Sequence, residues 1–513
     1  MRGRGLAWAW ALVLLPALAV AQRPDEADLF GAPAETPDAG TGAGDAGAPG
    51  TQGEQPKPPV DNRDAEALTQ GAIKDAFAPG GEAVEDPLKI GGRFYLQAGF
   101  SGGYGRDVRD ARFSSPTLVD GYFDARPNDR IRGMLAARLT FDASAAQGIT
   151  EAPASRVERD LTLVLEQAES RNPNVLLDQA WLRFDIERAV FLTVGRQHVK
   201  WGTGRIWNPT DYLTAARRDP LAFIDTRLGT SMVKVHVPWE SAAANFYGYG
   251  LLDVDGPAGI LRQIGGAARA ELVVLKTAEV GLGAVVQRGR QPRFALDIST
   301  PLGPVDVYGE LALKRGEDDP PKVRECGDTC PLTPVRLTVA GAPLNVEVDT
   351  GYELYYQEGW TPGATAGVEW TFAYADNETA TVGAEYFYNS GGYTDPALYS
   401  ALLLGGLLSP FYMGQHYAAL YATVIGPGSW DKTAFLLFNL ANLSDRSFVS
   451  RLNFSVQVMT YLTVEAYGAV HYGNPNGVFR LGMQVDPIPV LLPEGLNLPA
   501  ALWDVGMGLR VSL

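Results

Sequence analysis

Sulfur and histidine are scarce in this sequence of 513 residues, which holds two cysteines and four histidines. Cys326 and Cys330 lie in Cys-Gly-Asp-Thr-Cys with no histidine nearby. A structural zinc site needs four ligands, so this pair instead predicts a small disulfide loop in an exported protein. The histidines are dispersed, and no metalloprotease, nucleophile-elbow or nucleotide-binding motif occurs. We therefore predict no metal, no cofactor and no catalytic residue.

Long apolar runs are also lacking after the first residues of the chain. At the start, Arg2 and Arg4 precede an apolar stretch over 6–18, and Ala19-Val20-Ala21 forms an A-x-A cleavage site. This arrangement is typical of a secretory signal peptide, which we predict over residues 1–21. The stretch is shorter than the roughly 20 residues of a membrane-spanning helix. The mature chain is therefore expected to be either secreted and soluble, or inserted in a membrane through strands.

The overall composition excludes one class of partner and leaves the fold open. The formal net charge is -16, which argues against nucleic acid. The hydrophobic content is 46%, which is ordinary for a globular protein. A membrane-spanning β-barrel has a similar content, because only every second strand residue faces lipid.

Residues 22–88 differ in composition from the rest of the chain. They are rich in Ala, Gly, Pro, Thr and acidic residues, and their only aromatics are Phe30 and Phe77. Such a segment buries too little apolar surface to offset its chain entropy, so we predict a disordered periplasmic linker. A short helix over 65–77 that acts as a contact segment or a plug is the alternative.

Residues 89–513 read as short strands that alternate apolar and polar side chains, separated by Gly, Pro, Asn and Asp. In the clearest one, Ile131, Leu135 and Leu139 share one face, and Arg132 and Arg138 share the other. The same partition recurs over 160–166, 178–186, 305–314, 448–458 and 462–470. The segments are too many for one soluble sandwich, and their polar faces carry charges of both signs. We predict an all-β, transmembrane antiparallel β-barrel of about 18 strands, within a range of roughly 14 to 20.

Aromatic residues near segment ends support a membrane location, because such residues form girdles at the two interfaces. We assign to the girdles Phe94, Tyr95, Phe100, Trp370, Phe372, Tyr386, Phe387, Tyr388, Phe411, Tyr412, Tyr417 and Tyr421. Two other stretches do not read as strands. Residues 316–343 contain both cysteines and are expected to form an extracellular loop, and the apolar residues 395–410 could form a short helix that folds inward.

The last residues, Gly508-Leu509-Arg510-Val511-Ser512-Leu513, resemble the terminal assembly signal of bacterial outer-membrane proteins. Leu513 stands where Phe is usual, and Met507 stands where a polar residue is usual. The resemblance implies a location in the outer membrane, with its lipid and lipopolysaccharide as partners. It also implies that the barrel assembly machinery recognises the C-terminal strand.

The most distinctive local segment is Gly-Arg-Gln-His-Val-Lys-Trp-Gly-Thr-Gly-Arg-Ile-Trp at 195–207, followed by Asn-Pro-Thr-Asp at 208–211. With the Pro-containing basic stretch up to Pro238, it resembles a motif of large proteobacterial outer-membrane barrels of porin-like or unassigned function. The resemblance covers under a tenth of the chain. It implies a barrel that acts as a channel or export pore, and it implies no particular substrate.

This segment is a long connection between strands, and its Trp, Gly and Arg content argues against disorder. It could fold into the lumen and constrict it, where rings of Arg and Lys favour anions. It could equally remain an external loop whose charges pair with neighbours or with lipopolysaccharide phosphates. Asp211 and Asp219 would be internal partners of the basic residues. The candidates for the constriction are Arg196, Lys200, Trp201, Arg205, Asp211, Arg217, Arg218 and Arg227.

The polar faces of the predicted strands supply candidates for the lumen wall. These are Arg132, Arg138, Arg183, Asp185, Lys234, Arg269, Glu271, Asp306, Glu310, Arg451 and Glu465. Carboxylates and cations alternate among them, which predicts a hydrated and cross-paired interior that holds an electric field across the pore.

The sequence therefore favours a porin-like channel in the cell outer membrane for passive diffusion of small hydrophilic solutes. A homo-oligomer is a possible assembly of this channel. The first alternative is a plugged structural or adhesive barrel whose N-terminal arm binds a periplasmic partner. The second is a barrel hydrolase, for which His416 on a strand is the candidate base. Hydrolysis of lipid or peptide that is lost when His416 is replaced would identify the hydrolase.

Overall fold

The computed structural model describes residues 87–158, 160–214, 216–252, 264–316, 321–327, 329–339, 342–375, 378–404, 406–427, 430–485 and 496–513. The predicted signal peptide over 1–21 and the linker that follows it up to residue 86 lie outside the described residues. The first described strand begins at Leu88.

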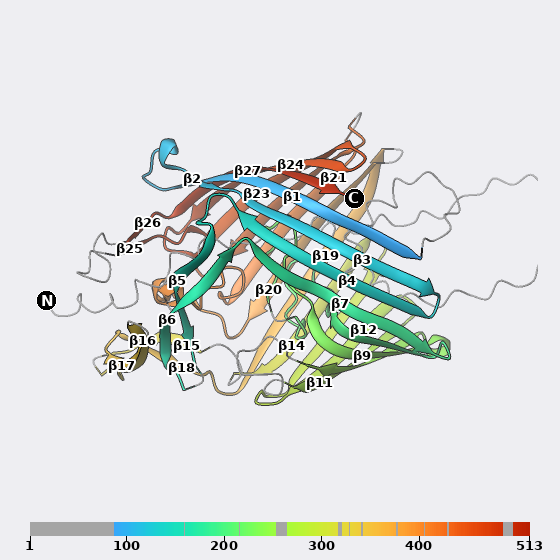
Figure 1. Cartoon of the computed structure of the whole chain (residues 1–513), viewed down its shortest axis with the longest axis horizontal. Helices are drawn as coiled ribbons and strands as arrows, with labels where there is room; N and C mark the ends of the chain where they lie inside the picture. The colour runs from blue at the N-terminus through green and yellow to red at the C-terminus, as the bar shows by residue number, and fades with distance from the viewer. Residues whose placement is uncertain are drawn as a thin grey trace, which may run out of the picture.

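Eighteen long strands among the described residues form one closed antiparallel barrel, which confirms the predicted fold (Figure 1). They are β1 (Leu88–Gly103), β3 (Pro116–Asn128), β4 (Ile131–Asp142), β7 (Asn174–Ile186), β8 (Val190–Gln197), β9 (Thr230–Trp239), β10 (Ala244–Leu251), β11 (Gly265–Val274), β12 (Ala278–Gln287), β13 (Arg293–Leu302), β14 (Val305–Arg315), β19 (Trp360–Ala375), β20 (Glu378–Asn389), β21 (His416–Ile425), β22 (Thr433–Asn442), β23 (Ser447–Met459), β24 (Leu462–Gly473) and β27 (Ala501–Ser512). The pairing of β27 with β1, from Arg93 opposite Ser512 to Gly103 opposite Ala501, closes the barrel. Closure leaves no open edge with unpaired backbone groups.

The wall alternates strictly between an apolar outer face and a polar inner face. In β13, Phe294, Leu296 and Ile298 are 40–44% exposed on the outside, whereas Ala295 and Asp297 are buried on the inside. The same belt of exposed Val, Leu, Ile and Phe continues around the barrel. Water disfavours so large an apolar surface, and the acyl chains of a bilayer accommodate it.

Among the described residues, no helix combines the length and the apolar character needed to cross a membrane.

Short turns and long connections lie at opposite ends of the barrel. The turns between β7 and β8 and between β11 and β12 are tight, with left-handed backbone at Glu187, Arg188, Leu275 and Lys276. The long connections carry additional elements, which gather at the left of Figure 1. They are η5 (Val108–Asp110), β2 (Arg112–Ser114), β5 (Gly148–Val157), β6 (Leu163–Asn172), β15 (Lys322–Glu325), β16 (Thr333–Val339), β17 (Ala342–Val348), β18 (Tyr352–Tyr355), η8 (Pro396–Leu398), α2 (Tyr399–Leu404), η9 (Val478–Arg480), β25 (Met483–Val485) and β26 (Leu496–Leu498). The remaining element, η6 (Glu240–Ala242), lies in the short turn between β9 and β10.

Two of the long connections join into one small sheet outside the barrel. The hairpin of β5 and β6 pairs through a parallel contact of β6 with the hairpin of β16 and β17. Leu163, Val335, Leu403 and Met483 form a buried cluster beneath this sheet, one from each of four connections. The prediction of a barrel strand over 160–166 is therefore wrong, because Leu163 faces this cluster and not lipid. The described residues of 316–343 lie outside the barrel wall as expected, but they contain β15 and β16.

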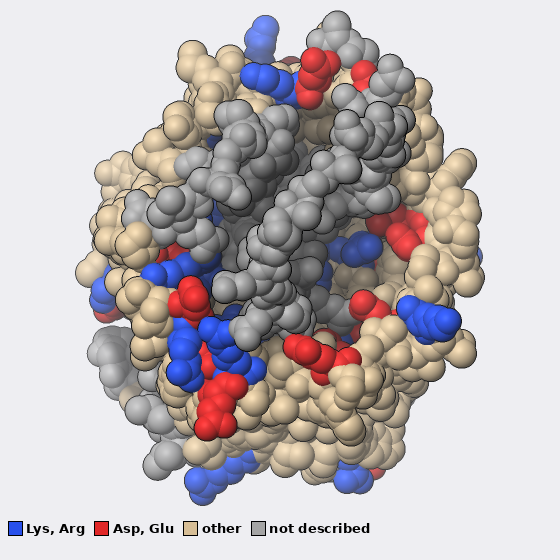
Figure 2. Space-filling model, turned by 90° about the vertical axis from the view of Figure 1, so that its right-hand side faces the viewer, with Lys and Arg blue, Asp and Glu red and all other residues tan. Residues whose placement is uncertain are grey.

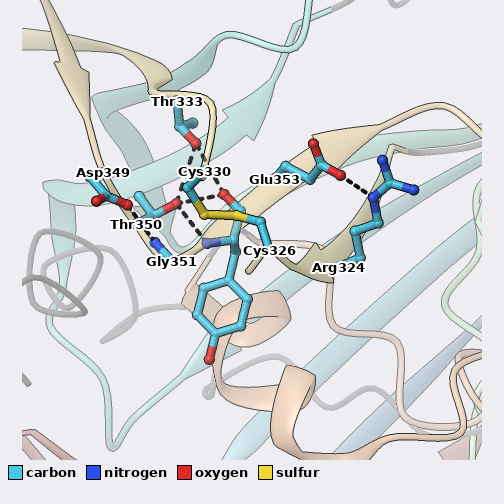
Figure 3. The surroundings of a disulfide bond; sticks show 9 residues. Arg324, Cys326, Cys330, Thr333, Asp349, Thr350, Gly351 and Glu353 are labelled. Carbon is cyan, nitrogen blue, oxygen red and sulfur yellow. Dashed lines mark hydrogen bonds and ion pairs between the residues drawn. A yellow bond between two sulfur atoms is a disulfide. The ribbon is translucent and has the colours of Figure 1, made fainter. Parts of the chain in front are cut away.

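The two cysteines form a disulfide between β15 and β16, with their Cα atoms 5.3 Å apart (Figure 3). The backbone N–H of Cys326 donates to the carbonyl of Gly351, and the Thr333 and Thr350 hydroxyls lie 3.3 Å apart next to it. Arg324 forms an ion pair with Glu353 across β15 and β18. The disulfide therefore closes a small turn in a connection that is already held by strand pairing.

We expect the double variant C326S/C330S to loosen this connection without unfolding the barrel. The loop that the disulfide closes is short, so its loss costs about 2 kcal/mol of local stability on a chain-entropy estimate. Limited proteolysis should cut faster within 321–359, whereas the heat-dependent shift of the barrel in gel electrophoresis should persist. Loss of that shift would show that the barrel itself depends on the disulfide.

Several aromatics that we assigned to interfacial girdles lie inside the barrel. Tyr95, Phe387, Tyr417 and Tyr421 are each at most 5% exposed and face the lumen. Neighbouring strand residues point to opposite faces, so consecutive aromatics such as those at 386–388 cannot all face lipid. Phe411 and Tyr412 belong to an inward-folded connection and pack against the interior core. That connection contains α2, as predicted for 395–410.

Candidate functional site

The connection between β8 and β9, residues 198–229, folds into the barrel and is called the lumen segment here. Both of its ends contact Asp178 on β7. His198 Nε2 lies 2.8 Å from the Asp178 carboxylate, and the Gly229 N–H donates to the Asp178 carbonyl at 3.2 Å. Trp201 and Trp207 within the segment are at most 1% exposed. The segment is thus an ordered part of the interior.

A buried carboxylate on β14 fixes the first turn of the lumen segment. Glu310 accepts hydrogen bonds from the backbone N–H of Thr203 at 2.7 Å and of Gly204 at 2.5 Å, and from the Thr210 hydroxyl at 2.7 Å. A Cβ at Gly202 would lie 2.4 Å from this carboxylate, and φ at Gly202 is +90°. Glycine at this position therefore allows the close approach of the backbone to Glu310.

A second carboxylate, on β20, binds the next three residues. Glu385 is 2% exposed and accepts the backbone N–H of Arg205 at 2.8 Å, of Ile206 at 3.1 Å and of Trp207 at 2.7 Å. The Tyr308 hydroxyl donates to the same carboxylate at 2.8 Å. Glu310 and Glu385 together satisfy the backbone donors that this irregular turn would otherwise leave unpaired in the interior.

Arg205 connects this turn to β19, the strand that lies between β14 and β20. Its guanidinium lies 3.3 Å from Glu369 on β19 and stacks over the Tyr308 ring, and its carbonyl accepts from Arg218 at 2.7 Å. The Arg205 side chain is 39% exposed although it lies inside the barrel. Solvent-accessible space therefore remains beside the segment at this level.

Apolar packing fills the side of the lumen formed by β20 to β24. Trp207 stacks on Phe387 with ring centres 5.8 Å apart, and its indole N–H donates to the Phe411 carbonyl at 2.9 Å. Tyr399 and Leu402 of α2 belong to the same buried cluster. A second buried cluster, which includes Trp201 and Met232, packs against β9 to β13.

The later part of the lumen segment reaches the wall formed by β23, β24, β1 and β3. The guanidinium of Arg451 donates to the Leu221 carbonyl at 2.5 Å and lies over the ring of Phe223. Phe223 and Ile224 cluster with Tyr95, Leu118 and Tyr467 of the wall. The lumen segment therefore crosses the barrel from β14 and β20 to β1 and β3.

An ion-pair network holds the return of the segment to β9. Arg227 lies 2.5 Å from Asp225 and 3.4 Å from Asp211. Burial raises the pKa of the Asp225 carboxyl, but the neighbouring Arg227 guanidinium lowers it more, so this pKa lies well below its usual range. Asp225 therefore stays ionised near neutral pH and neutralises Arg227. We did not predict Asp225 from the sequence.

The structure removes one residue from the predicted constriction set. Arg196 lies opposite Ala180 and Ser231, on the same side of the wall as the outward-facing Val194. Strand β8 extends to Gln197, so alternation turns Arg196 away from the lumen. The Asp219 carboxylate accepts the backbone N–H of Leu221 at 2.8 Å, and its pairing with the basic residues stays a prediction.

The other constriction candidates belong to the lumen segment. Trp201 contacts Tyr249 and lies under the Arg269 guanidinium. Arg217 stacks over Tyr412 with its guanidinium 4.9 Å from the ring centre. The lumen segment contains seven of the predicted constriction residues, which are Lys200, Trp201, Arg205, Asp211, Arg217, Arg218 and Arg227. Whether they limit passage stays a prediction.

The lumen-wall candidates form cross-strand ion pairs, and several of their partners escaped the sequence analysis. Arg138 pairs with Asp120 at 2.8 Å and with Asp178 at 3.5 Å, and Arg132 pairs with Asp124 at 2.9 Å. Other pairs are Arg269 with Asp297 and Glu271, Glu465 with Arg510, and Asp185 with Arg130. Lys234 lies over Tyr247, Arg183 lies over Phe191, and Asp306 is exposed next to a short turn. Asp120 and Asp124 could have been predicted as lumen-wall residues, because the alternation of β3 places them on the same inner face as Leu118.

Cations and carboxylates are intermixed inside the barrel. The inward-facing cations of β3 and β4 pair with Asp120, Asp124 and Asp178 on β3 and β7. Glu310, Glu369 and Glu385 lie on β14, β19 and β20, where they are occupied by the segment. Figure 2 looks onto the end of the barrel that carries the short turns and shows acidic and basic side chains around a central hollow.

Among the described residues, no group of three or more His, Cys, Asp or Glu side chains could hold a metal ion.

No protein-family model matches the sequence, and no curated protein matches it. Among solved structures, the chain is similar to OccAB1 of Acinetobacter baumannii, with a TM-score of 0.47 and 10% identity over 84% of this chain and 98% of that one. OpdK of Pseudomonas aeruginosa with vanillate gives a TM-score of 0.44 and 9% identity over 83% and 98%. A mutant of Rh. blastica porin gives 0.36 and 10% over 83% and 100%.

Proposed function

We propose that the protein is a porin-like channel of the outer membrane through which small hydrophilic solutes diffuse passively. The observation that carries this proposal is a closed barrel with an apolar outer belt and an ionised interior, narrowed by an ordered segment that leaves space beside it. Arg132 is 26% and Arg205 39% exposed within this interior. Long connections face the cell exterior and short turns the periplasm in bacterial barrels, which gives the orientation.

The proposed path passes the solvent-exposed side chains of Arg132 on β4 and Arg205 beside β19, because buried apolar clusters occupy β20 to β24 and β9 to β13. The lumen segment is its constriction, and the exposed cations along the path favour small anions. Neither an energy source nor a covalent step is involved. Size and electric field set the selectivity.

The test is single-channel conductance of the mature protein in a planar bilayer, with the reversal potential measured under a salt gradient. We expect discrete conductance steps and a reversal potential that shows anion preference. Absence of conductance from protein that shows the heat-dependent gel shift of a folded barrel would reject the open channel.

A plugged structural barrel is the second candidate, and one observation favours it. The lumen segment crosses the whole interior and contacts β14, β20, β23, β1 and β3. If the space beside it is not continuous, no solute passes. The conductance measurement separates the two candidates.

An enzymatic role has less support. His416 lies on the outward side of β21, and its Nδ1 is 2.6 Å from the Tyr386 hydroxyl. The Ser444 hydroxyl accepts the backbone N–H of His416, so it is not placed as a nucleophile next to the ring. This arrangement is typical of a polar pair at the membrane interface.

A further inference from the structure

The connection between β24 and β27 folds inward at the end of the barrel that carries the long connections. Its short element η9 buries Val478 and Phe479, which are 6% and 5% exposed. The Phe479 ring lies against Phe411 and Tyr417, with ring centres 5.6 Å and 6.4 Å apart. Since the Phe411 carbonyl accepts the indole N–H of Trp207, η9 packs on the same core as the lumen segment.

One histidine of the barrel wall holds η9. His471 lies on the inner face of β24, in the same alternation as the buried Tyr467 and Ala469. Its Nδ1 lies 2.7 Å from the Phe479 carbonyl oxygen, and its Nε2 lies 2.7 Å from the Asp504 carboxylate on β27. Among the described residues, these two groups are the only hydrogen-bond partners of the ring. A single imidazole therefore connects η9 to β27.

Both partners of the His471 ring are acceptors. A carbonyl oxygen and an ionised carboxylate have no proton to donate, so the ring makes both hydrogen bonds only when both of its nitrogens carry protons. A neutral ring next to a protonated Asp504 carboxyl holds the same number of protons. In either form, the arrangement is complete only while the pair binds one additional proton. His416 differs, because its partner is the Tyr386 hydroxyl, which can donate to a neutral ring.

The other charged groups on the elements packed against this ring have partners of their own or point to solvent. The partners are Arg510 on β27 for Glu465 on β24, the Leu221 carbonyl for Arg451 on β23, the Gly473 carbonyl for Arg480 on η9, and the Val478 N–H for Asp445 in the turn before β23. Arg446 in the same turn is exposed. Asp504 is therefore the charged group that faces the His471 ring directly.

We propose that His471 and Asp504 form a pH-sensitive latch, which holds η9 on the interior core while the pair binds its additional proton and loosens η9 as the pH rises. Histidine is the side chain whose charge ordinarily changes between about pH 5 and about pH 8. The two side chains are 13% and 29% exposed, so solvent can exchange the proton. Once the proton is lost, one ring nitrogen faces an acceptor without a hydrogen between them. The contacts of η9 with Asp445 and Ser447 remain, so the change is local and the barrel stays folded.

The test compares the unchanged full-length mature protein with D504N and H471F in a neutral detergent. Hydrogen exchange of the amides at 478–481 is measured at about pH 5.5 and about pH 8.5, on either side of the ordinary histidine range. Each rate is divided by that of an unstructured chain at the same pH, which gives a protection factor. In the unchanged protein, we expect protection to fall by about tenfold at the higher pH, because one charge-assisted hydrogen bond is lost.

The two variants should remove the pH dependence in opposite ways. In D504N, the asparagine NH2 group can donate to Nε2 of a neutral ring, while Nδ1–H still donates to the Phe479 carbonyl. Both hydrogen bonds then form without the additional proton, so protection should stay high at both pH values. H471F keeps an aromatic ring but makes neither hydrogen bond, so protection should be low at both.

Three results would overturn the proposal. These are equal protection of the unchanged protein at both pH values, a fall in D504N that matches the unchanged protein, and a pH dependence that persists in H471F. The heat-dependent gel shift shows that each variant is folded. Because the measurement reports backbone exchange and not transport, a barrel without conductance would reject the proposed channel and leave the latch to be decided by these rates.

Discussion

Replacing Glu385 by glutamine is expected to release the lumen segment from β20 while the barrel stays closed. The carboxylate accepts hydrogen bonds from three consecutive backbone N–H groups and from the Tyr308 hydroxyl. Glutamine has nearly the same shape, but its NH2 group cannot accept, so about half of these contacts are lost. Hydrogen bonds to a charged acceptor contribute about 1.5 kcal/mol or more each, so the segment loses about 3 kcal/mol of local stability.

Hydrogen exchange of the amides at 205–207 measures this loss directly. We expect it to accelerate by about 100-fold in E385Q. Single channels should show a higher mean conductance and more open-channel noise, because the segment then moves within the lumen. The control is D306N, which makes the same change at an exposed position of β14 next to a short turn. If amides 205–207 exchange equally in both variants, Glu385 does not hold the segment.

Thr210 offers a milder variant of the same test that leaves both carboxylates in place. The T210V substitution removes the hydroxyl that donates to Glu310 at 2.7 Å and preserves side-chain size. We expect a smaller acceleration of exchange, by about 10-fold, at Thr203 and Gly204. If exchange accelerates at Thr203 and Gly204 but not at 205–207, the two carboxylates act independently, whereas acceleration confined to 205–207 would contradict the prediction.

Removing cations from the proposed path is expected to reduce anion preference. The variant R132Q/R183Q/K200Q removes two positive charges from the inner faces of β4 and β7 and one from the lumen segment. In water-like surroundings, a unit charge about 8 Å from a passing ion contributes about 0.5 kcal/mol. The same charge disfavours a passing cation equally, and salt screening about halves both contributions. Three charges then change the anion-to-cation permeability ratio by about tenfold, which the reversal potential under a salt gradient reports.

The control for this prediction is R106Q/R109Q/K276Q, which removes the same charge from exposed connections outside the lumen. Its permeability ratio should stay close to that of the unchanged chain. A ratio that changes equally in both variants would show that the field at the mouths sets the selectivity. If the permeability ratio of R132Q/R183Q/K200Q stays unchanged, the solute path does not pass these three residues.

The barrel could be predicted because each strand carries its own signal. Ile131, Leu135 and Leu139 against Arg132 and Arg138 show a period of two, and this period directly assigns one face to lipid and the other to the interior. Residues 160–166 show the same period, and there the prediction failed. A strand half-buried against an external cluster, such as Leu163 with Val335, produces the same alternation as one half-buried in a membrane.

The inward fold of the lumen segment was one of two alternatives at the sequence level. Its Trp, Gly and Arg content indicated order, but the residues that decide its position are Glu310, Glu369 and Glu385, more than 90 positions away. Nothing local links those carboxylates to the turn at 203–210. For Arg196 the local strand decides the position. β8 continues to Gln197, so the alternation of the strand places the Arg196 side chain on the outer face.

The sequence by itself determined the class of fold, the approximate strand number and the two faces of the wall, because alternation and turn residues act over a few positions. Only the tertiary structure decided which connections enter the lumen, which carboxylates bind them, and which side of the interior remains accessible to solvent. These features depend on side chains that closure of the barrel brings together from distant strands. Their energies come from buried hydrogen bonds and packing, which have no period in the sequence.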